Sequence, residues 1–411
     1  MKRFNLKMNK SIFIYIVLFV PFFELQTFEM LESSPILPEL WSKIMISYSI
    51  LRLLITTWLI LNIMNKEKIC ISAATKGIVI FLALENLASL LNGSLYINYF
   101  IGSFSIVGLL LLCEKIIKKS PDKFLRASLI FFGCYSILGA IQIILQPNGF
   151  YNPTYGKAYG IYLLGSKNSS IFYFIVFLYL MIFKACKEKK SKNSVFIYLI
   201  LFVIASLCSD SMNSVLALLI IAVFMALMKR RKIIQKFFSE RKLISLSVII
   251  ACILLVPEFR KCLAPILKIS GRDLSFTGRD VLWSQGINAF LNHPFIGNGI
   301  NTQFFLKTGV AQNHCHNYFL DQMAKYGLFS FIAVACTIIA IAIKTSKMEV
   351  SNEEIRSLNR GFIFVMIIHS MIDQMNIYIL AYMLITIELL TVSESKNELG
   401  YRQWRKRKII V

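Results

Sequence analysis

The polar segment 276–320 combines a basic side chain with imidazoles. It holds Arg279 and three of the four histidines of the chain, His293, His314 and His316. A guanidinium forms paired hydrogen bonds with phosphate oxygens, and an imidazole is the usual general base near neutral pH. These residue types together suggest transfer chemistry on a phosphate-containing substrate, with Arg279 as the phosphate ligand and His316 as the base. We expect a supporting role at most for His314, and a turn position for His293 before Pro294.

Two helices are expected to position these side chains. Thr277 and Asp280 have the spacing of a capping box, which predicts a helix from Thr277 to about Asn292. One face of this helix would carry Arg279, Trp283, Gly286 and Phe290. A second helix is expected from about Asn313, and one face of it would carry His316, Leu320, Met323 and Gly327.

A turn with two glycines, Gly297 and Gly299, joins the two predicted helices. Glycine allows backbone to come close to another group, so both glycines are candidate substrate contacts. Packing or anchoring at the headgroup level is the favoured role of Trp283, and a surface on which a sugar stacks is the alternative.

The rest of the chain is that of a membrane protein. It is 56% hydrophobic and 16% charged, and runs of roughly 17–25 apolar residues recur along it, each long enough to cross a bilayer. The runs are continuous rather than alternating, which excludes a β-barrel. The sequence therefore predicts an all-α polytopic membrane protein with about twelve transmembrane helices. They are expected at 11–29, 43–64, 76–93, 96–114, 126–146, 169–186, 194–211, 213–229, 243–257, 325–343, 361–373 and 376–392.

The net charge of +23 reflects topology rather than nucleic-acid binding. Most of the basic residues lie in short segments between the apolar runs, which is the positive-inside pattern. These segments are Lys2–Lys10, Lys66–Lys76, Lys115–Arg126, Lys184–Lys192, Lys229–Lys242, Lys344–Arg360 and Lys396–Lys408. We therefore expect a multi-pass protein of the cell membrane with both termini in the cytoplasm, and no nucleic-acid partner.

This topology divides the chain into four parts. Residues 1–256 hold the first nine spans, 257–324 form a large extracytoplasmic loop with short helices, 325–392 hold the last three spans, and 393–411 form a basic cytoplasmic tail. A loop of that length is usually functional or disordered, and its aromatic and periodic apolar residues favour function. Segment 146–169, which contains Lys167, is expected on the same outer side.

The large loop resembles that of the bacterial O-antigen polymerase and ligase family, the Wzy-type polysaccharide polymerases. The resemblance rests on an ordered motif: Thr277-Gly278-Arg279, Trp283, Phe290, His293-Pro294, Gly297, Gly299, His316-Asn317, Tyr318, Leu320 and Gly327. It implies a GT-C-like, metal-independent, inverting glycosyltransferase without a cofactor. The implied donor is a glycan on a polyprenyl (undecaprenyl) diphosphate, held by Arg279, while His316 helps to deprotonate the acceptor.

One departure from the family concerns a second phosphate-binding cation. Many relatives carry an arginine after a serine at the outer end of an earlier span, whereas this chain has Ser209, Asp210 and Ser211 there. Arg272 and Lys167 are the candidates for the missing cation. Asn317, beside His316, and Asp373, near the outer end of the eleventh span, complete the predicted substrate-binding set.

Three functions remain open. The first is a polymerase that moves a growing glycan from its carrier to a lipid-linked repeat unit, for capsule, exopolysaccharide or O-antigen, with a chain-length regulator and membrane lipid as further partners. The second is a ligase that moves finished glycan to another acceptor. The third is a transporter or flippase of lipid-linked sugars, which would carry polar residues along a central cavity between related halves. The clean spans and the polar outer loop favour the enzymes.

Overall fold

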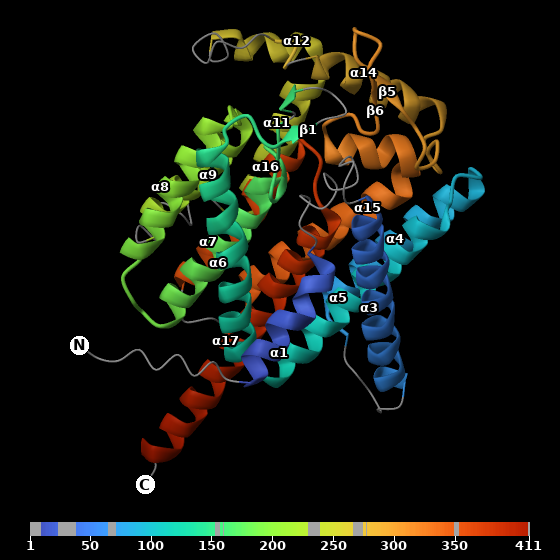
Figure 1. The fold of residues 1–411 in the computed structure, drawn as a ribbon. Helices are drawn as coiled ribbons and strands as arrows, with labels where there is room; N and C mark the ends of the chain where they lie inside the picture. Colours follow the sequence, from blue (N-terminus) through green and yellow to red (C-terminus); the bar gives the residue numbers. More distant parts are fainter. Residues whose placement is uncertain are drawn as a thin grey trace.

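The computed structural model describes residues 10–23, 38–64, 71–152, 157–158, 160–228, 239–265, 274–276, 278–348 and 353–409. It is a bundle of long helices with shorter elements gathered at one end (Figure 1). The bundle helices are α1 (Lys10–Phe19) with η1 (Val20–Phe22), α3 (Pro38–Met64), α4 (Ala73–Leu91), α5 (Ile97–Lys119), α6 (Pro121–Leu145), α7 (Ser170–Lys187), α8 (Asn193–Cys208), α9 (Met212–Leu227), α11 (Glu240–Leu255), α15 (Tyr318–Lys347), α16 (Glu353–Ser370) and α17 (Ile377–Ile409).

The all-α class and the multi-pass membrane character are confirmed. Each of the twelve predicted spans falls on a helix of the bundle. Seven of the described helices are long and apolar enough to cross a membrane, and an eighth results if α11 and the bent segment Pro257–Leu263 are one span. Helices α8 and α9 have 16 residues each, about 24 Å of helix, and are shorter than a straight crossing of a bilayer needs. Among the described residues, therefore, fewer than twelve helices are long and apolar enough for a straight crossing.

Helices α7 and α17 lie at the centre of the bundle. Nearly every residue of α7 is buried, and so is the run from Ile379 to Leu390 of α17. Helices such as α3 and α8 are apolar but largely exposed, as expected for helices that face lipid.

The two ends of the bundle differ in chemistry. Lys118 at the end of α5, Lys187 at the end of α7 and Lys344 near the end of α15 form ion pairs with carboxylates, and we call this the lysine end. Helix α1 begins there, and α17 ends there (Figure 1). The opposite end, at the top of Figure 1, carries α14 (Arg279–Asn292) and is called the site end.

Two buried glutamates cap α4 at the lysine end. Glu114 of α5 accepts hydrogen bonds from the backbone N–H of Ser72 and from the hydroxyl of Thr75. Glu388 of α17 accepts from the backbone N–H groups of Ala73 and Ala74 and from Lys344. Carboxylates thus satisfy the free N–H groups of a helix start and join α4, α5, α15 and α17.

The site end is built from short elements. They are the hairpins β1 (Tyr151–Asn152) with β2 (Lys157–Ala158), β3 (Ile161–Tyr162) with β4 (Gly165–Ser166), and β5 (Phe304–Phe305) with β6 (Ala311–Gln312), together with α12 (Pro257–Arg260), η2 (Lys261–Leu263) and α14. Helix α14 packs on α15, which is kinked at Gly327 with φ 78° and ψ −176°. A Cβ at Gly327 would lie 2.2 Å from the carbonyl oxygen of Phe295, so the kink brings two backbones into contact.

Candidate functional site

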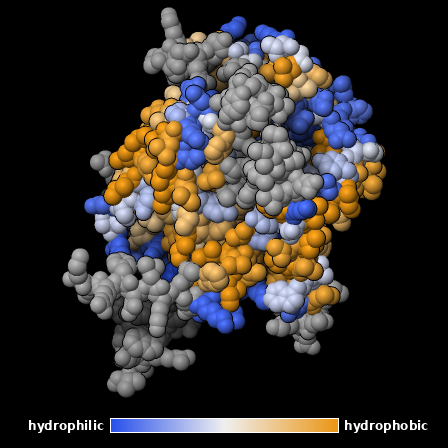
Figure 2. Space-filling view, viewed as in Figure 1, coloured by the Kyte–Doolittle hydropathy of each residue, from blue (hydrophilic) through white to orange (hydrophobic). Residues whose placement is uncertain are grey.

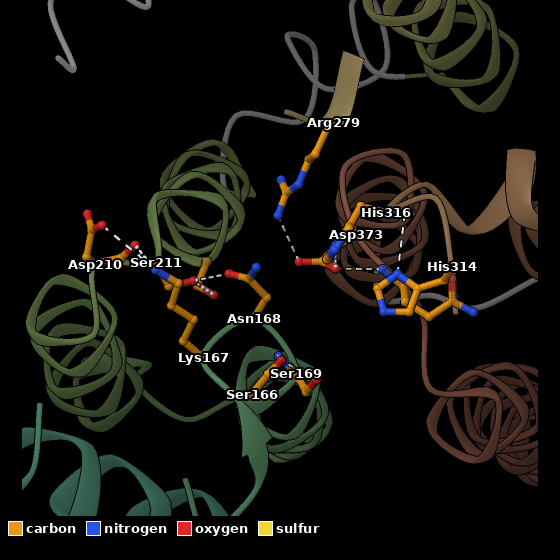
Figure 3. Close-up of polar contacts among 12 residues, drawn as sticks. Ser166, Lys167, Asn168, Ser169, Asp210, Ser211, Arg279, His314, His316 and Asp373 are labelled. Carbon is orange, nitrogen blue, oxygen red and sulfur yellow. Dashed lines mark hydrogen bonds and ion pairs between the residues drawn. The ribbon is translucent and has the colours of Figure 1, made fainter. Parts of the chain in front are cut away.

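Three charged or titratable side chains meet at the site end (Figure 3). His316 Nδ1 lies 3.1 Å from one carboxylate oxygen of Asp373, and Arg279 lies 3.4 Å from the other. The Asp373 side chain is 8% exposed, against 17% for Arg279 and 25% for His316. The structure therefore brings together three residues predicted for the site. The Asp373 carboxylate is the most buried of the three side chains.

Arg279 is the first residue of α14. Gly278 occupies the N-cap position with φ 84°, and its N–H donates to the Ser275 hydroxyl. The prediction of Thr277 as the capping residue is therefore wrong in register, and Thr277 itself lies outside the described residues. A left-handed φ suits glycine at this position. The predicted end of the helix at Asn292, before Pro294, is confirmed.

His316 lies in a turn and not on a helix. Its φ is 52°, an uncommon left-handed conformation for a non-glycine residue, and α15 begins only at Tyr318. The prediction of a helix from Asn313, with His316 on its face, is therefore wrong. Asn317 ends the turn as the N-cap of α15, since its side chain accepts a hydrogen bond from the Leu320 N–H.

An ion pair in the first turns of α15 holds the segment that carries His316. Asp321 accepts a hydrogen bond from the backbone N–H of Cys315, at 3.2 Å, and lies 3.0 Å from Lys325. Lys325 in turn donates to the carbonyl of Asn313. Both side chains are at least nine-tenths buried. This pair is not among the predicted site residues, although the spacing of four residues between Asp321 and Lys325 is visible in the sequence.

Trp283 supports the same turn from α14. It is fully buried, its indole N–H donates to the carbonyl of His316 at 3.5 Å, and the guanidinium of Arg260 lies 5.0 Å from its ring centre. No face of the Trp283 ring is exposed, so the structure gives no support to the predicted sugar contact. Asn317 is 2% exposed and serves as a cap, so its predicted substrate contact is also not supported.

His314 lies against His316. Their ring centres are 4.3 Å apart, and the backbone N–H of His316 donates to Nδ1 of His314 at 3.4 Å. Burial and the neighbouring His316 lower the pKa of His314 to about 4, which keeps its ring neutral at physiological pH. A neutral ring can accept this hydrogen bond, so His314 supports the turn as expected.

Asp373 lies in the turn between α16 and α17. Burial alone would raise its pKa, but the hydrogen bond with His316 and the charge of Arg279 hold the pKa of Asp373 well below its usual range. The carboxylate is therefore ionised at physiological pH. His369, one helical turn earlier, is 1% exposed, packs edge-on against Phe172, and has no hydrogen-bond partner among the described residues at either ring nitrogen.

The glycine-rich turn contacts protein rather than open space. Gly297 and Gly299 have φ values of 74° and 84°. A Cβ at Gly297 would lie 2.3 Å from the carbonyl oxygen of Lys325, and one at Gly299 would lie 2.3 Å from the Ser94 hydroxyl. Both glycines permit close packing on α15 and on the turn between α4 and α5. This packing accounts for both glycines, and their role as substrate contacts stays a prediction.

Lys167 and Arg272 were the two candidates for a second cation. Lys167 lies 3.8 Å from the carboxylate of Asp210 in the turn between α8 and α9, and the neighbouring Asn168 accepts a hydrogen bond from Ser211. Figure 3 shows this group in the same view as Arg279 and Asp373, and none of the interactions drawn there joins the two groups. Arg272 lies outside the described residues.

An apolar cavity of about 420 Å³ opens beside the His316 turn. Its walls come from α11, α15 and α16, and include Ala251, Leu255, Phe319, Met323 and Ile367. Asn317 lines its end near the site. The arrangement places an apolar chamber next to a polar, charged site, as a substrate with an apolar and an anionic part requires.

The comparisons with known proteins agree with the loop motif. Residues 195–335 match the family model described as "O-Antigen ligase". No curated protein matches the chain. The matched range runs from α8 to α15 and includes Arg279 and His316, so the resemblance is confirmed over this range. Together with the spanning helices, the match supports a membrane enzyme of the O-antigen ligase or polymerase type, which transfers glycosyl groups.

Proposed function

We propose that this enzyme is a polysaccharide polymerase. It transfers a growing glycan from polyprenyl diphosphate to a lipid-linked repeat unit at the outer face of the cell membrane, with both termini in the cytoplasm. The observation that carries the proposal is the arrangement of Arg279 and His316 on the two oxygens of Asp373. A phosphate ligand and a base are held by one ionised acid at the end of a membrane-spanning bundle.

His316 is the proposed general base. Contact with the Asp373 carboxylate favours a proton on Nδ1, which leaves Nε2 as the acceptor for the proton of the acceptor hydroxyl. The hydroxyl oxygen bonds to the anomeric carbon, and the bond from that carbon to the diphosphate oxygen breaks. The proton passes to His316, the leaving diphosphate takes the bonding electrons, and Asp373 stabilises the imidazolium. Attack opposite the leaving group inverts the anomeric centre.

Arg279 is the proposed diphosphate ligand. Its contact with Asp373, at 3.4 Å, is long for a charged hydrogen bond, so the guanidinium can turn toward a more strongly charged diphosphate. The positive end of the α14 helix dipole, where Arg279 lies, also favours an anion. Stabilisation of the leaving group by fixed positive charge needs no metal ion.

Lys167 is the proposed second cation, in place of the arginine that the turn between α8 and α9 lacks. Its partner, Asp210, is 77% exposed, so the ion pair between them is a weak surface pair that a diphosphate can replace. A Lys167→Met variant should need more donor for half-maximal rate, with a smaller effect on the maximal rate. A lower maximal rate with no change in the donor concentration for half-maximal rate would contradict this role.

The cavity beside Asn317 is the proposed site of the first isoprene units of the carrier. It is lined almost wholly by apolar side chains, and the end next to His316 meets the polar site. The undecaprenyl chain of the donor would then enter between α11 and α15, and its diphosphate would reach Arg279. Apolar burial contributes affinity without restricting the sugar that is transferred.

A ligase is the second candidate. The description of the matched family names O-antigen ligases, and the same base and phosphate ligand would serve a transfer of finished glycan to another acceptor. The two reactions differ in the acceptor alone. Identification of the acceptor therefore decides between them.

The test is the size distribution of surface glycan. A strain that lacks the protein is complemented with wild type, Arg279→Ala or His316→Ala, with His293→Ala and Arg241→Ala as controls, because both control side chains are exposed and lie outside the site. A polymerase predicts collapse to a single repeat unit in the first two variants and a normal ladder in the controls. Finished polymer that accumulates on its lipid carrier indicates the ligase. An unchanged ladder in Arg279→Ala and His316→Ala contradicts both.

A further inference from the structure

Large apolar side chains are exposed where α14 ends. Leu291 is 64% exposed, Phe295 59% and Ile296 45%. Earlier on the exposed face of the same helix the residues are polar, namely Ser284 and Asn288. The exposed apolar side chains therefore lie in the last turn of α14 and in the turn that follows, where Asn292 and His293 are exposed as well. We call Leu291, Phe295 and Ile296, with Phe329 of α15, the apolar tip.

The apolar tip is fixed to a membrane-spanning helix. The Phe295 ring stacks on Phe329, with ring centres 5.9 Å apart and planes 30° apart. The backbone N–H of Leu328 donates to the carbonyl of Pro294 at 2.7 Å. Leu328 and Phe329 directly follow the kink at Gly327 and begin the apolar part of α15. Phe295 is therefore held against the first apolar turn of α15 after the kink.

The turn between two other spanning helices contacts the segment that follows the apolar tip. The N–H of Ile300 donates to the hydroxyl of Ser94, in the turn between α4 and α5. On either side of that turn, Leu91 at the end of α4 is 61% exposed and Ile97 at the start of α5 is 69% exposed. Figure 2 shows hydrophobic side chains over this end of α4 and hydrophilic ones above it.

We propose that the apolar tip lies in the acyl-chain region of the membrane leaflet at the site end. Its occupant is phospholipid, because the tip joins the surfaces of α4, α5 and α15, which as membrane spans face lipid. The loop expected wholly outside the membrane thus dips into it at one point. Helix α14 is anchored at its last turn, which fixes the height of Arg279 above the bilayer. This inference concerns position alone and does not depend on the proposed reaction.

The test compares two tryptophan reporters. Phe295→Trp keeps an aromatic ring on Phe329, and Val310→Trp places one at a position of similar exposure, 52%, in the β5–β6 hairpin. The full-length protein is reconstituted in phosphatidylethanolamine and phosphatidylglycerol vesicles, with acyl chains that are plain or brominated near the headgroup. The emission added by each reporter over the wild type is then measured. Iodide in the water serves as the opposing quencher.

The proposal predicts that brominated lipid quenches the Phe295→Trp emission and iodide does not, whereas Val310→Trp shows the reverse. Quenching of Phe295→Trp by iodide alone would place the tip in water and overturn the proposal. Protection of this reporter from both quenchers would mean that another protein surface covers the tip, which also overturns it. Since neither readout requires glycan transfer, failure here is separate from failure of the proposed function.

Discussion

Two carboxylate-centred clusters lie at opposite ends of the same bundle, and they differ in how completely their polar atoms are paired. At the lysine end, Glu114 and Glu388 accept hydrogen bonds at all four oxygens, from the start of α4 and from lysines. At the site end, Asp373 is paired, but both ring nitrogens of His369 and the side-chain oxygen of Gln374 have no partner among the described residues.

The difference separates a cluster that holds helices from one that acts on a ligand. Buried polar groups are normally hydrogen-bonded, and each exception has a cost that selection tolerates where function requires it. In the cluster at α4, every carboxylate oxygen is hydrogen-bonded, so this cluster contributes only to stability. The site end keeps polar groups and partly exposed bases beside an apolar cavity, which is the arrangement that a substrate requires.

The sharpest way to break this comparison is to neutralise Asp373. Asp373→Asn removes the acceptor that orients His316 and stabilises its protonated form, so the transfer rate should fall by roughly 10²–10⁴-fold. The rate per folded molecule is measured with purified protein in vesicles. Since the carboxylate is ionised well below neutral pH, the wild type should show no loss of rate from Asp373 protonation between pH 5 and about 8. A rate close to wild type would remove Asp373 from the mechanism.

The opposite outcome is expected at the lysine end. The N–H groups of Ala73 and Ala74 donate to the two oxygens of Glu388, and a glutamine offers only one oxygen. Glu388→Gln should therefore lower the free energy of unfolding by about 3 kcal/mol. The rate per folded molecule should not change. Thermal unfolding in detergent measures the loss, and Lys344→Met, which removes a 43% exposed partner, should cost only about 1 kcal/mol or less. A rate defect in folded Glu388→Gln protein would erase the distinction between the ends.

The Asp321–Lys325 pair tests whether the site end also depends on saturated contacts. Lys325→Met leaves the Asp321 carboxylate buried without its cation and should cost about 3 kcal/mol in free energy of unfolding. Asp321→Asn in the same chain should recover part of that loss, in a double-mutant cycle. Rates should stay reduced in both, because the hydrogen bond to the Asn313 carbonyl is gone. Strictly additive losses would mean that the two side chains do not act as a pair.

The smallest expected effect concerns His314 and pH. Its folded-state pKa, about 4, lies below the unfolded value of about 6.5, so the unfolded chain binds a proton first as the pH falls. The free energy of unfolding of the wild type should therefore decrease from about pH 6.5 to pH 4, in part because of this group. His314→Gln should show less of this decrease in thermal unfolding across that range. Identical acid sensitivity in the two proteins would exclude the buried neutral histidine as its source.

Local signals in the sequence predicted some of the site and misplaced the rest. Pro294 predicts the end of α14, because the residue before a proline disfavours helix. Asp373 is predictable because an ionisable residue near the end of a span is a candidate for function. His316 was misplaced because helical periodicity was extended over the turn that Asn317 closes. The actual start signal, the asparagine cap, was present but was assigned to substrate binding.

Other residues required the tertiary structure. Glycines at 297 and 299 do permit close approach, but nothing local distinguishes a ligand from the backbone of α15 as the partner. Trp283 on the face of α14 could be packed or exposed until the position of Arg260 and the His316 turn was known. Lys325 is the first residue of a predicted span, and that assignment gives no sign of its pairing with Asp321 across one helical turn.

The most direct test of the central claim is a single-turnover transfer measured with the purified full-length protein in vesicles. Lipid-linked repeat units of the host serve as both donor and acceptor, and the wild type is compared with His316→Ala and with the control His293→Ala. The proposed base predicts a loss of roughly 10²–10⁴-fold in the first variant and none in the control. A first-turnover rate in His316→Ala equal to that of the wild type would show that the Arg279–Asp373–His316 arrangement is not where the glycosyl transfer takes place.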